Sequence, residues 1–460
     1  MQKHFQTVGL PILNRGRLLA TILVLFSVLG CNKLSDQLPW HHHGDDDHGT
    51  NNGNIKNEKG NLVYDWIDLQ TRNILNSNPT IPNGVVIRAF AYTGIALYEA
   101  AQRGIPGNTS LSGRVYQMPD MPHPTGNNYS WTESANAALA ASTRLFYPAM
   151  TTAQKASVDS LEAVYEARFR AIETQDVIDK SKAFGVSIAN AVFDYASSDL
   201  FNVANAPYTP PVFPGAWEPT PPAFASAATP YAGNMRPFLH AHTTSVAGPP
   251  AFPYSETVGS DFYKMVRDIY DVSNNLTADQ KNMALWWNDL GLYTGYTPPG
   301  HIMNVVSQIL RKENKDLITS IQCYTKTGMA LWDGLIVVFR SKYKYNLVRP
   351  VTYIRKVIDP SWSSLIPTPP HPEYPAAHAF ITSSAMAALA SEIGNDHPFT
   401  DHTYEFLGWP VRSFANLNDV GIEAGNSRRF GGIHYAPSIA VGHELGKKVG
   451  EEIGAISFKK

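Results

Sequence analysis

The sequence predicts an all-α fold made of two helical bundles, and three observations support this prediction. From Asn61 onward, apolar residues recur at helical spacing and strand-like alternation is scarce. Residues 85–101 (VVIRAFAYTGIALYEAA) are apolar nearly all round, as in a helix at the centre of a bundle. A Pro-rich stretch near the middle of the chain separates two sets of helical patterns.

The first bundle is predicted over residues 61–204. Its central helix, residues 85–101, is followed by amphipathic patterns of helical period. Thr152 is followed by Lys155 rather than by an acid, so the capping signal at that point is only partial. The predicted amphipathic helices cover residues 134–146, 152–172 and 176–195.

The connector between the bundles is predicted over residues 205–255. Its first part, APYTPPVFPGAWEPTPPAF, holds proline at a density that excludes both a helix and a central strand. We interpret it as an extended strap that lies over the surface. Trp217 and Phe213 are expected to anchor the strap, because a free linker would leave both rings in water.

The second bundle is predicted over residues 256–460. Thr277 followed by Gln280 has the signature of a capping box and marks the start of one of its helices. A bundle of this size can hold a polar site in its core. The predicted helices cover residues 261–270, 277–292, 300–312, 316–339, 375–393, 423–428 and 433–453.

The composition limits the classes of partner. With 43% hydrophobic residues, the chain can bury a large core. The formal net charge of -2 argues against a general binder of nucleic acid or of anionic membranes, since both require a basic surface. The two cysteines, Cys31 and Cys323, provide no disulfide framework.

Residues 1–30 are predicted to be an export signal. Basic residues precede an apolar run over residues 18–29, which is too short to span a bilayer. The ending Val-Leu-Gly-Cys is similar to a bacterial lipobox, which predicts lipidation of Cys31. The alternative is an ordinary secretory signal with an incidental cysteine. We expect an exported bacterial protein, periplasmic or on the cell surface, held to the membrane only by its lipid anchor.

Residues 31–60 are predicted to be a polar tether, because they contain few apolar residues. Residues 41–48 (HHHGDDDH) are rich in histidine and aspartate, and such a tract can hold a metal ion loosely. The alternative is a solvated linker, since nothing in the tract fixes the geometry of its ligands.

Three short stretches near the C-terminal end concentrate cations and histidines beside proline and glycine. They are KYKYNLVRP (342–350), PAAH (375–378) and SRRFGGIH (427–434). Together they offer fixed cations and two imidazoles, which suit a tetrahedral oxyanion such as phosphate or vanadate. Taken singly, each stretch also fits a structural role, as basic residues at a helix end or as a satisfied buried histidine.

The two histidines occupy positions suited to chemistry. His378 follows Pro375 and small residues at a predicted helix N-terminus, where free backbone N–H groups attract an anion. There it can act as a general acid or base. His434 follows two glycines that allow a close backbone approach, and can serve as a nucleophile or as an apical ligand of a metal oxyanion.

The order and spacing of these stretches resemble the type-2 phosphatidic acid phosphatase and vanadium haloperoxidase superfamily. The segments PGAWEPTPPAF, WWNDLGLYTGYTPPGH and PPHPEYPAAH resemble its bacterial haloperoxidase-like branch. The resemblance thus covers most of the mature chain, and it implies an all-helical protein of two bundles.

The resemblance also implies site roles. Lys342, Arg349 and Arg428 would bind the equatorial oxygens of vanadate or phosphate. His434 would be the apical vanadate ligand, or the nucleophile that accepts a phosphoryl group. His378 would activate peroxide or protonate a leaving group.

Three positions depart from the family pattern. The usual Ser-Gly before the first histidine is Ala376-Ala377 here, so one hydroxyl donor is lost while the backbone N–H of Ala377 is kept for the anion. The aspartate often found four residues after the last histidine is Ser438, which predicts that His434 lacks its usual carboxylate partner.

Three further residues are expected around this site. Asp289 is a candidate partner that orients an arginine. His371 lies five residues before Ala376, where haloperoxidases place a side chain that shapes the halide pocket, and Phe339 would line the same pocket. His371 alternatively caps the helix that follows.

The leading hypothesis is a vanadium-dependent haloperoxidase-like oxidoreductase, which would oxidise a halide with hydrogen peroxide at a His434-ligated vanadate. The first alternative is an acid phosphatase that acts on a phosphate ester through phospho-His434. The second is a catalytically degenerate lipoprotein of the same fold. The retained cations oppose it, because a buried cluster of them is costly without an anion. No oligomeric state is predicted.

Overall fold

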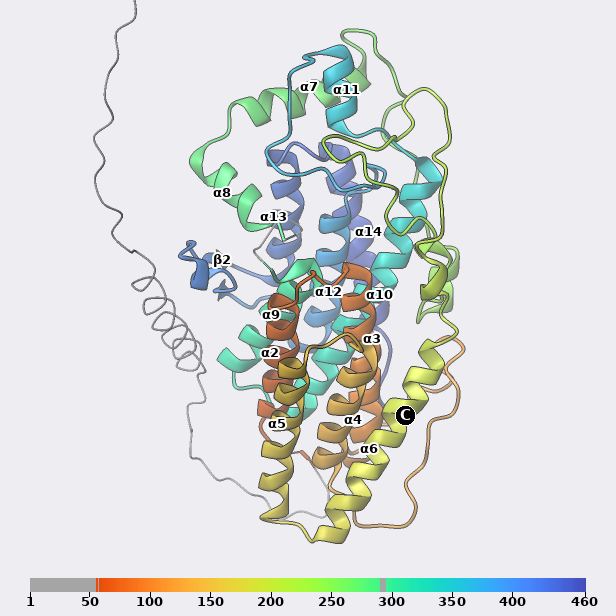
Figure 1. The fold of residues 1–460 in the computed structure, drawn as a ribbon, viewed down its shortest axis with the longest axis vertical. Helices are drawn as coiled ribbons and strands as arrows, with labels where there is room; N and C mark the ends of the chain where they lie inside the picture. The colour runs from red at the N-terminus through yellow and green to blue at the C-terminus, as the bar shows by residue number, and fades with distance from the viewer. Residues whose placement is uncertain (1–54, 57, 290–294) are drawn as a thin grey trace, which may run out of the picture. The chain divides into compact units, whose positions relative to one another are not determined.

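The computed structural model describes residues 55–56, 58–289 and 295–460, and in these residues the fold is almost entirely helical (Figure 1). The all-α prediction is confirmed. The α-helices are α2 (Asn61–Leu75), α3 (Asn83–Ala101), α4 (Trp131–Phe146), α5 (Thr152–Arg170), α6 (Gln175–Ala196), α7 (Asp261–Asn274), α8 (Ala278–Trp286), α9 (Thr297–Lys312), α10 (Leu317–Tyr345), α11 (Pro350–Val357), α12 (Ala377–Ile393), α13 (Leu417–Phe430) and α14 (Ala436–Gly454). Two strands, β1 (Phe399–Asp401) and β2 (Arg412–Phe414), and short 3-10 turns such as η4 (His240–Thr243) complete it.

Several predictions fall on residues outside this described part. They are the signal over residues 1–30, the lipidation of Cys31, the His/Asp tract at 41–48 and most of the tether over 31–60. Of the tether, residues 55–56 and 58–60 are described, and among them Ile55 and Gly60 are buried. Among the described helices, none has the length and hydropathy needed to cross a membrane.

Helix α10 is the central element of the fold. It packs against α3 on one side and α12 on another, and in Figure 1 it runs between the α2–α6 group (red to yellow) and the α12–α14 group (blue). Helices α3 and α10 come close through glycine: a Cβ added to Gly94 would lie 2.9 Å from the Cα of Thr325. The predicted division into bundles over residues 61–204 and 256–460 stays a prediction, and helices from its two sides pack directly together.

A stripe of glycine brings α14 against α12. A Cβ added to Gly442 would lie 2.7 Å from the carbonyl oxygen of Ala376, and Gly446 and Gly450 meet backbone carbonyls of α12 in the same way. Since these glycines are four residues apart, they lie on one face of the helix. The close approach fixes the start of α12 relative to the start of α14.

The Pro-rich connector pairs with the loop that follows α10. The backbone N–H of Trp217 donates to Asn346 O at 2.6 Å, and that of Val348 donates to Gly215 O at 2.9 Å. Trp217 is buried, as predicted. The prediction for Phe213 is wrong: its side chain is 46% exposed, because the chain turns between it and Ala216 instead of continuing along the surface.

Local capping largely follows the sequence. Thr277 and Gln280 form the predicted capping box at the start of α8. At α5 the capping box uses Thr151 with Gln154, one residue before the pair considered from the sequence. Both boxes satisfy backbone N–H groups that a helix start leaves free.

Replacing Gly94 by alanine tests the contact between α3 and α10. We expect Gly94→Ala to lower the free energy of unfolding by about 1–3 kcal/mol. The new methyl group would collide with the Cα of Thr325, and a backbone atom cannot rotate away as a side chain can. Gly248→Ala is the matched control, since a Cβ there meets nothing within 4 Å. Equal denaturation midpoints for the two variants, followed by circular dichroism, would contradict the packing described.

Candidate functional site

The three predicted cations converge on one buried site from three different elements. Lys342 lies in the last turn of α10, Arg349 is the N-cap of α11, and Arg428 lies in the last turn of α13. Their exposed fractions are 0%, 0% and 1%. We call these three residues the cation cluster. Burying three cations together is costly unless their surroundings compensate the charge.

Backbone carbonyls provide part of this compensation. The Nζ of Lys342 donates to Pro372 O and Glu373 O, both at 2.9 Å. An ammonium group has three N–H donors, so one more is available. Burial, and then repulsion by Arg349, hold the pKa of Lys342 well below its usual value, while the charge of Glu373 opposes this change.

Arg349 is held by five groups on two segments, one of them Pro369 O, which accepts from Nη2 at 3.3 Å. Its Nε donates to His371 O at 2.8 Å and its Nη1 donates to Ile433 O at 2.8 Å. Nη2 contacts His371 Nδ1 at 3.0 Å, and Nη1 contacts His434 Nε2 at 3.2 Å. Burial lowers the pKa of Arg349 to about 10, against the opposing charge of Glu373. The guanidinium thus contacts both the Pro-rich segment that carries His371 and the loop that carries His434.

The carbonyls come from a segment that cannot fold into a helix. Residues 366–375 (IPTPPHPEYP) contain proline at nearly every second position, and proline has no backbone N–H to donate. The carbonyl oxygens of this segment therefore stay free of helical hydrogen bonds. Lys342 and Arg349 use those of His371, Pro372 and Glu373.

Arg428 has fewer direct partners. Its Nε donates to Ser427 Oγ at 3.1 Å and its Nη2 donates to Ala284 O at 3.4 Å. Burial lowers the pKa of Arg428 to about 10, and the charge of Asp289 opposes this. Asp289 itself accepts hydrogen bonds from Tyr404 and from His301, so it acts on Arg428 through its charge.

His434 has a carboxylate partner that the sequence analysis missed. Its Nδ1 lies 2.8 Å from Oε1 of Glu373, which also accepts the backbone N–H of Tyr435 at 2.9 Å. Because Oε1 accepts the backbone donor, Nδ1 carries the proton and Nε2 carries the lone pair. The expectation that Ser438 leaves His434 without a carboxylate is therefore wrong. An acidic residue inside the Pro-rich PPHPEYPAAH segment was the available signal.

Glu373 is buried between this histidine and Lys342. Burial raises the pKa of Glu373 to about 7, although Lys342 and the N–H of Tyr435 lower it. The pKa of His434 lies well below its usual value because of burial and then the charges of Arg349 and Lys342. His434 is therefore neutral near pH 7, as a ligand or nucleophile must be.

His378 is the second residue of α12 and points an unpaired nitrogen into this region. Within the described part of the chain, its buried Nε2 has no hydrogen-bond partner. Burial, followed by the charges of Arg428 and His301, holds its pKa well below the usual value. Ala377 begins α12 and Ala376 is its N-cap, which gives no side-chain hydrogen bond.

The two residues predicted to line a halide pocket lie against each other. The ring centroids of Phe339 and His371 are 5.2 Å apart, with their planes tilted by 59°. Burial, and then the charges of Lys342 and Arg349, hold the pKa of His371 well below its usual value. His371 thus contributes a neutral ring and a backbone carbonyl beside the cation cluster.

These observations fit a bound oxyanion. Burial lowers the pKa of each cation of the cluster, so a further negative charge would stabilise all three. The unpaired Nε2 of His378 and the remaining N–H of Lys342 are suited to its oxygens. A tetrahedral anion would satisfy both the charge and the hydrogen-bonding groups.

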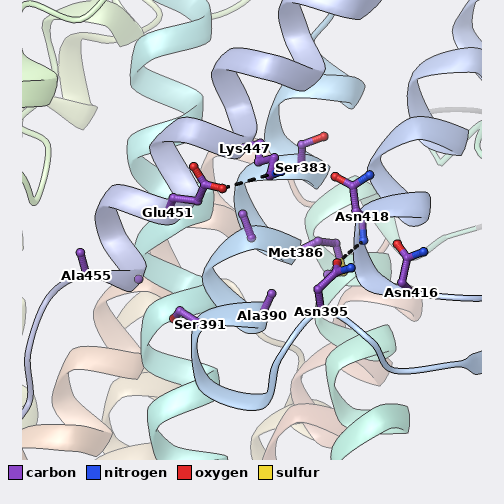
Figure 2. Close-up of a pocket in the computed structure, with 12 residues that line it drawn as sticks. Ser383, Met386, Ala390, Ser391, Asn395, Asn416, Asn418, Lys447, Glu451 and Ala455 are labelled. Carbon is purple, nitrogen blue, oxygen red and sulfur yellow. Dashed lines mark hydrogen bonds and ion pairs between the residues drawn. The ribbon is translucent and has the colours of Figure 1, made fainter.

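A separate cavity of about 710 Å³ lies beside the C-terminal half of α12 (Figure 2). In Figure 2, Lys447 and Glu451 of α14 form an ion pair at its edge, at 3.8 Å. Its lining residues are Ser383, Met386, Ala387, Ala390, Ser391, Asn395, Asn416, Asn418, Lys447, Glu451, Gly454 and Ala455. None of them belongs to the site around the cation cluster, so the cavity is not part of it.

One family model matches the part of the chain that carries these residues. A family model described as the VCPO second helical-bundle domain matches residues 322–457, which include the whole cation cluster and both histidines. No curated protein sequence matches the chain.

Solved structures match over most of the chain. A bacterial vanadium-dependent iodoperoxidase is 28% identical, with a TM-score of 0.78, and the match covers 87% of this chain and 97% of the other. The holo form of a bacterial vanadium-dependent chloroperoxidase is 16% identical, with a TM-score of 0.58 and coverage of 83% and 95%. The apo form of a bacterial vanadium-dependent chloroperoxidase is 16% identical, with a TM-score of 0.60, and the match covers 81% of this chain and 93% of the other. The chloroperoxidase likeness concerns the fold alone. The family model together with the iodoperoxidase match places the chain in the vanadium haloperoxidase superfamily.

Proposed function

We propose that the protein is a vanadium-dependent haloperoxidase, which oxidises a halide with hydrogen peroxide at a vanadate bound to His434. The observation that carries the proposal is the neutral His434, with Nδ1 hydrogen-bonded to Glu373 and Nε2 directed at Arg349. A ligand with its lone pair on Nε2, surrounded by buried cations, suits a metal oxyanion better than a simple halide.

The cation cluster would hold the oxygens of the anion. Lys342 offers a point charge, whereas Arg349 and Arg428 offer planar forks of N–H donors. When bound, vanadate supplies a Lewis-acid centre that activates peroxide toward a halide. In a site without bulk water, the cations withdraw charge strongly and need no reorganisation during the reaction.

His378 would act as the general base and acid for the proton of the peroxide. Its Nε2 is unpaired among the described residues, and its lowered pKa keeps the ring neutral near pH 7. A neutral imidazole can accept a proton at that nitrogen and return it later.

The substitution at Ala376 would weaken the anion's hydrogen bonding without removing the site. A lost hydroxyl donor to a charged group costs about 1.5–3 kcal/mol. The cation cluster is complete in spite of this loss. The backbone N–H of Ala377, at the first position of α12, remains as a donor.

A phosphatase is the second candidate, favoured by the same Glu373–His434 pair. A carboxylate that fixes the tautomer of a histidine and raises its basicity also activates it as a nucleophile toward phosphorus. His378 would then protonate the leaving group. A degenerate lipoprotein with neither activity is the remaining alternative. Export and the lipid anchor at Cys31 belong to the proposal in each case.

The first test is activity of the chain from residue 55 onward with and without vanadate. We expect peroxide-dependent oxidation of iodide or bromide that requires vanadate and is abolished in His434→Ala, because the variant lacks the nitrogen that would hold vanadate. Hydrolysis of a phosphate ester that vanadate inhibits would favour the phosphatase instead. A folded protein with neither activity would contradict both.

Glu373→Gln tests the carboxylate that orients His434. We expect turnover to fall about 10–100-fold, as is typical when the hydrogen-bond partner of a ligand is lost. Glu452→Gln is the matched control, because Glu452 accepts a hydrogen bond from a different buried histidine, His242. Steady-state kinetics with both variants decide the matter: an unchanged rate in Glu373→Gln would show that Glu373 has no part in the reaction.

A further inference from the structure

Another buried histidine, His301, lies between two carboxylates near the cation cluster. It is in the second turn of α9 and its exposed fraction is 0%. Its Nδ1 is 3.2 Å from Oδ1 of Asp289, and its Nε2 is 2.8 Å from Oδ2 of Asp401. Both ring nitrogens therefore face acceptors, which requires the doubly protonated, positively charged ring.

The surroundings of His301 stabilise this charge. Burial would lower the pKa of His301, but Asp289 and Asp401 raise it to about 10. Aromatic rings enclose the imidazolium: the ring centroid of Trp287 is 4.7 Å away, tilted by 30°, and that of Tyr404 is 5.1 Å away at 67°. The faces of such rings favour a cation, and the packed rings exclude water.

Asp289 connects this histidine to the anion site. One oxygen, Oδ1, accepts from His301 and from Tyr404, whereas the buried Oδ2 has no partner among the described residues. The charge of Asp289 acts on Arg428. A buried carboxylate without further partners would pair directly with the arginine or take up a proton.

The small hairpin links the same groups to α13. Asp401 is the last residue of β1 and lies opposite Arg412 of β2 in the register of the two strands. Arg412 in turn donates to Glu423 of α13, the helix that carries Arg428, with Nη2 to Oε2 at 2.9 Å. In Figure 1 the hairpin lies beside this helix. His301 and the hairpin thus hold α9, Asp289 and α13 in one arrangement.

We propose that His301 is a positioning residue of the oxyanion site, which acts through Asp289 on Arg428. By hydrogen-bonding Oδ1 and balancing its charge, His301 keeps Asp289 close enough to orient Arg428 without drawing the guanidinium away from the anion. The proposal rests on the oxyanion site of the proposed function, but it does not depend on which reaction that site performs.

The experiment is a calorimetric titration of the protein with orthovanadate, and separately with phosphate. We expect His301→Gln to raise the Kd for vanadate at least about 10-fold, by analogy with other partners of anion and metal ligands. His242→Gln is the matched control: His242 is equally buried and lies between Asp333 and Glu452, at 2.6 and 2.7 Å. We expect it to lower stability and to change Kd less than 2-fold.

A double-variant comparison separates positioning from general damage. In an Asp289→Asn background, His301→Gln should have no further effect on Kd, because the histidine acts through that carboxylate. A purely structural defect would add to the effect of Asp289→Asn and overturn the proposal. An equal loss of affinity in His242→Gln would overturn it as well.

Tyr404→Phe keeps the proposal testable if His301→Gln does not fold. It removes only the hydroxyl that donates to Asp289 and retains the ring beside His301. A weaker vanadate affinity with an unchanged melting temperature supports the role of Asp289, and an unchanged affinity overturns it. If the unaltered protein binds neither vanadate nor phosphate, the proposed function fails together with this inference. If it binds and His301→Gln binds equally, only the inference fails.

Discussion

The burial of three cations in one place is the constraint on which the site depends. Lys342, Arg349 and Arg428 are withdrawn from water, and removing a charge from water costs several kcal/mol unless its partners are well placed. The Pro-rich segment before α12 meets part of this cost with backbone carbonyls, and Glu373 and Asp289 meet another part with charge. The remaining positive charge would favour a bound anion.

The helical scaffold makes this arrangement possible because its helices approach closely. Glycines at the contacts of α3 with α10, and of α14 with α12, allow backbones to meet where any side chain would collide. The first of these contacts fixes α10, which carries Lys342. The second fixes the helix starts next to His378 and His434. The connector adds a further constraint through Trp217, which binds the loop just before Arg349.

Much of the fold and of the site could be predicted from the sequence. Helical period is a property of each segment by itself, so most of the helices and the capping box at Thr277 were found, whereas α2 and α11 were not predicted. The cations and histidines were found because proline, glycine and family spacing mark them. In the structure the charges of Lys342, Arg349 and Arg428 all act on His378, and His378 acts in turn on His434. Phe339 lies against His371.

What was missed depends on contacts between distant residues. Glu373 is 61 residues away from His434, and no local pattern shows that they pair. The contacts of His301 were equally hard to predict, since one of its two carboxylate partners is 100 residues away in the sequence. Strands of three residues, such as β1 and β2, are too short for alternation to be visible. Phe213 was assigned to the surface contact by its chemistry alone, and a turn directs it into solvent.

The most direct test of the central claim is a crystal structure of the protein soaked with orthovanadate. We predict vanadium density bonded to Nε2 of His434, with the vanadate oxygens contacted by Lys342, Arg349 and Arg428. Vanadate bound elsewhere, or a cluster that stays without an anion at saturating vanadate, would contradict the claim that these buried cations form an oxyanion site.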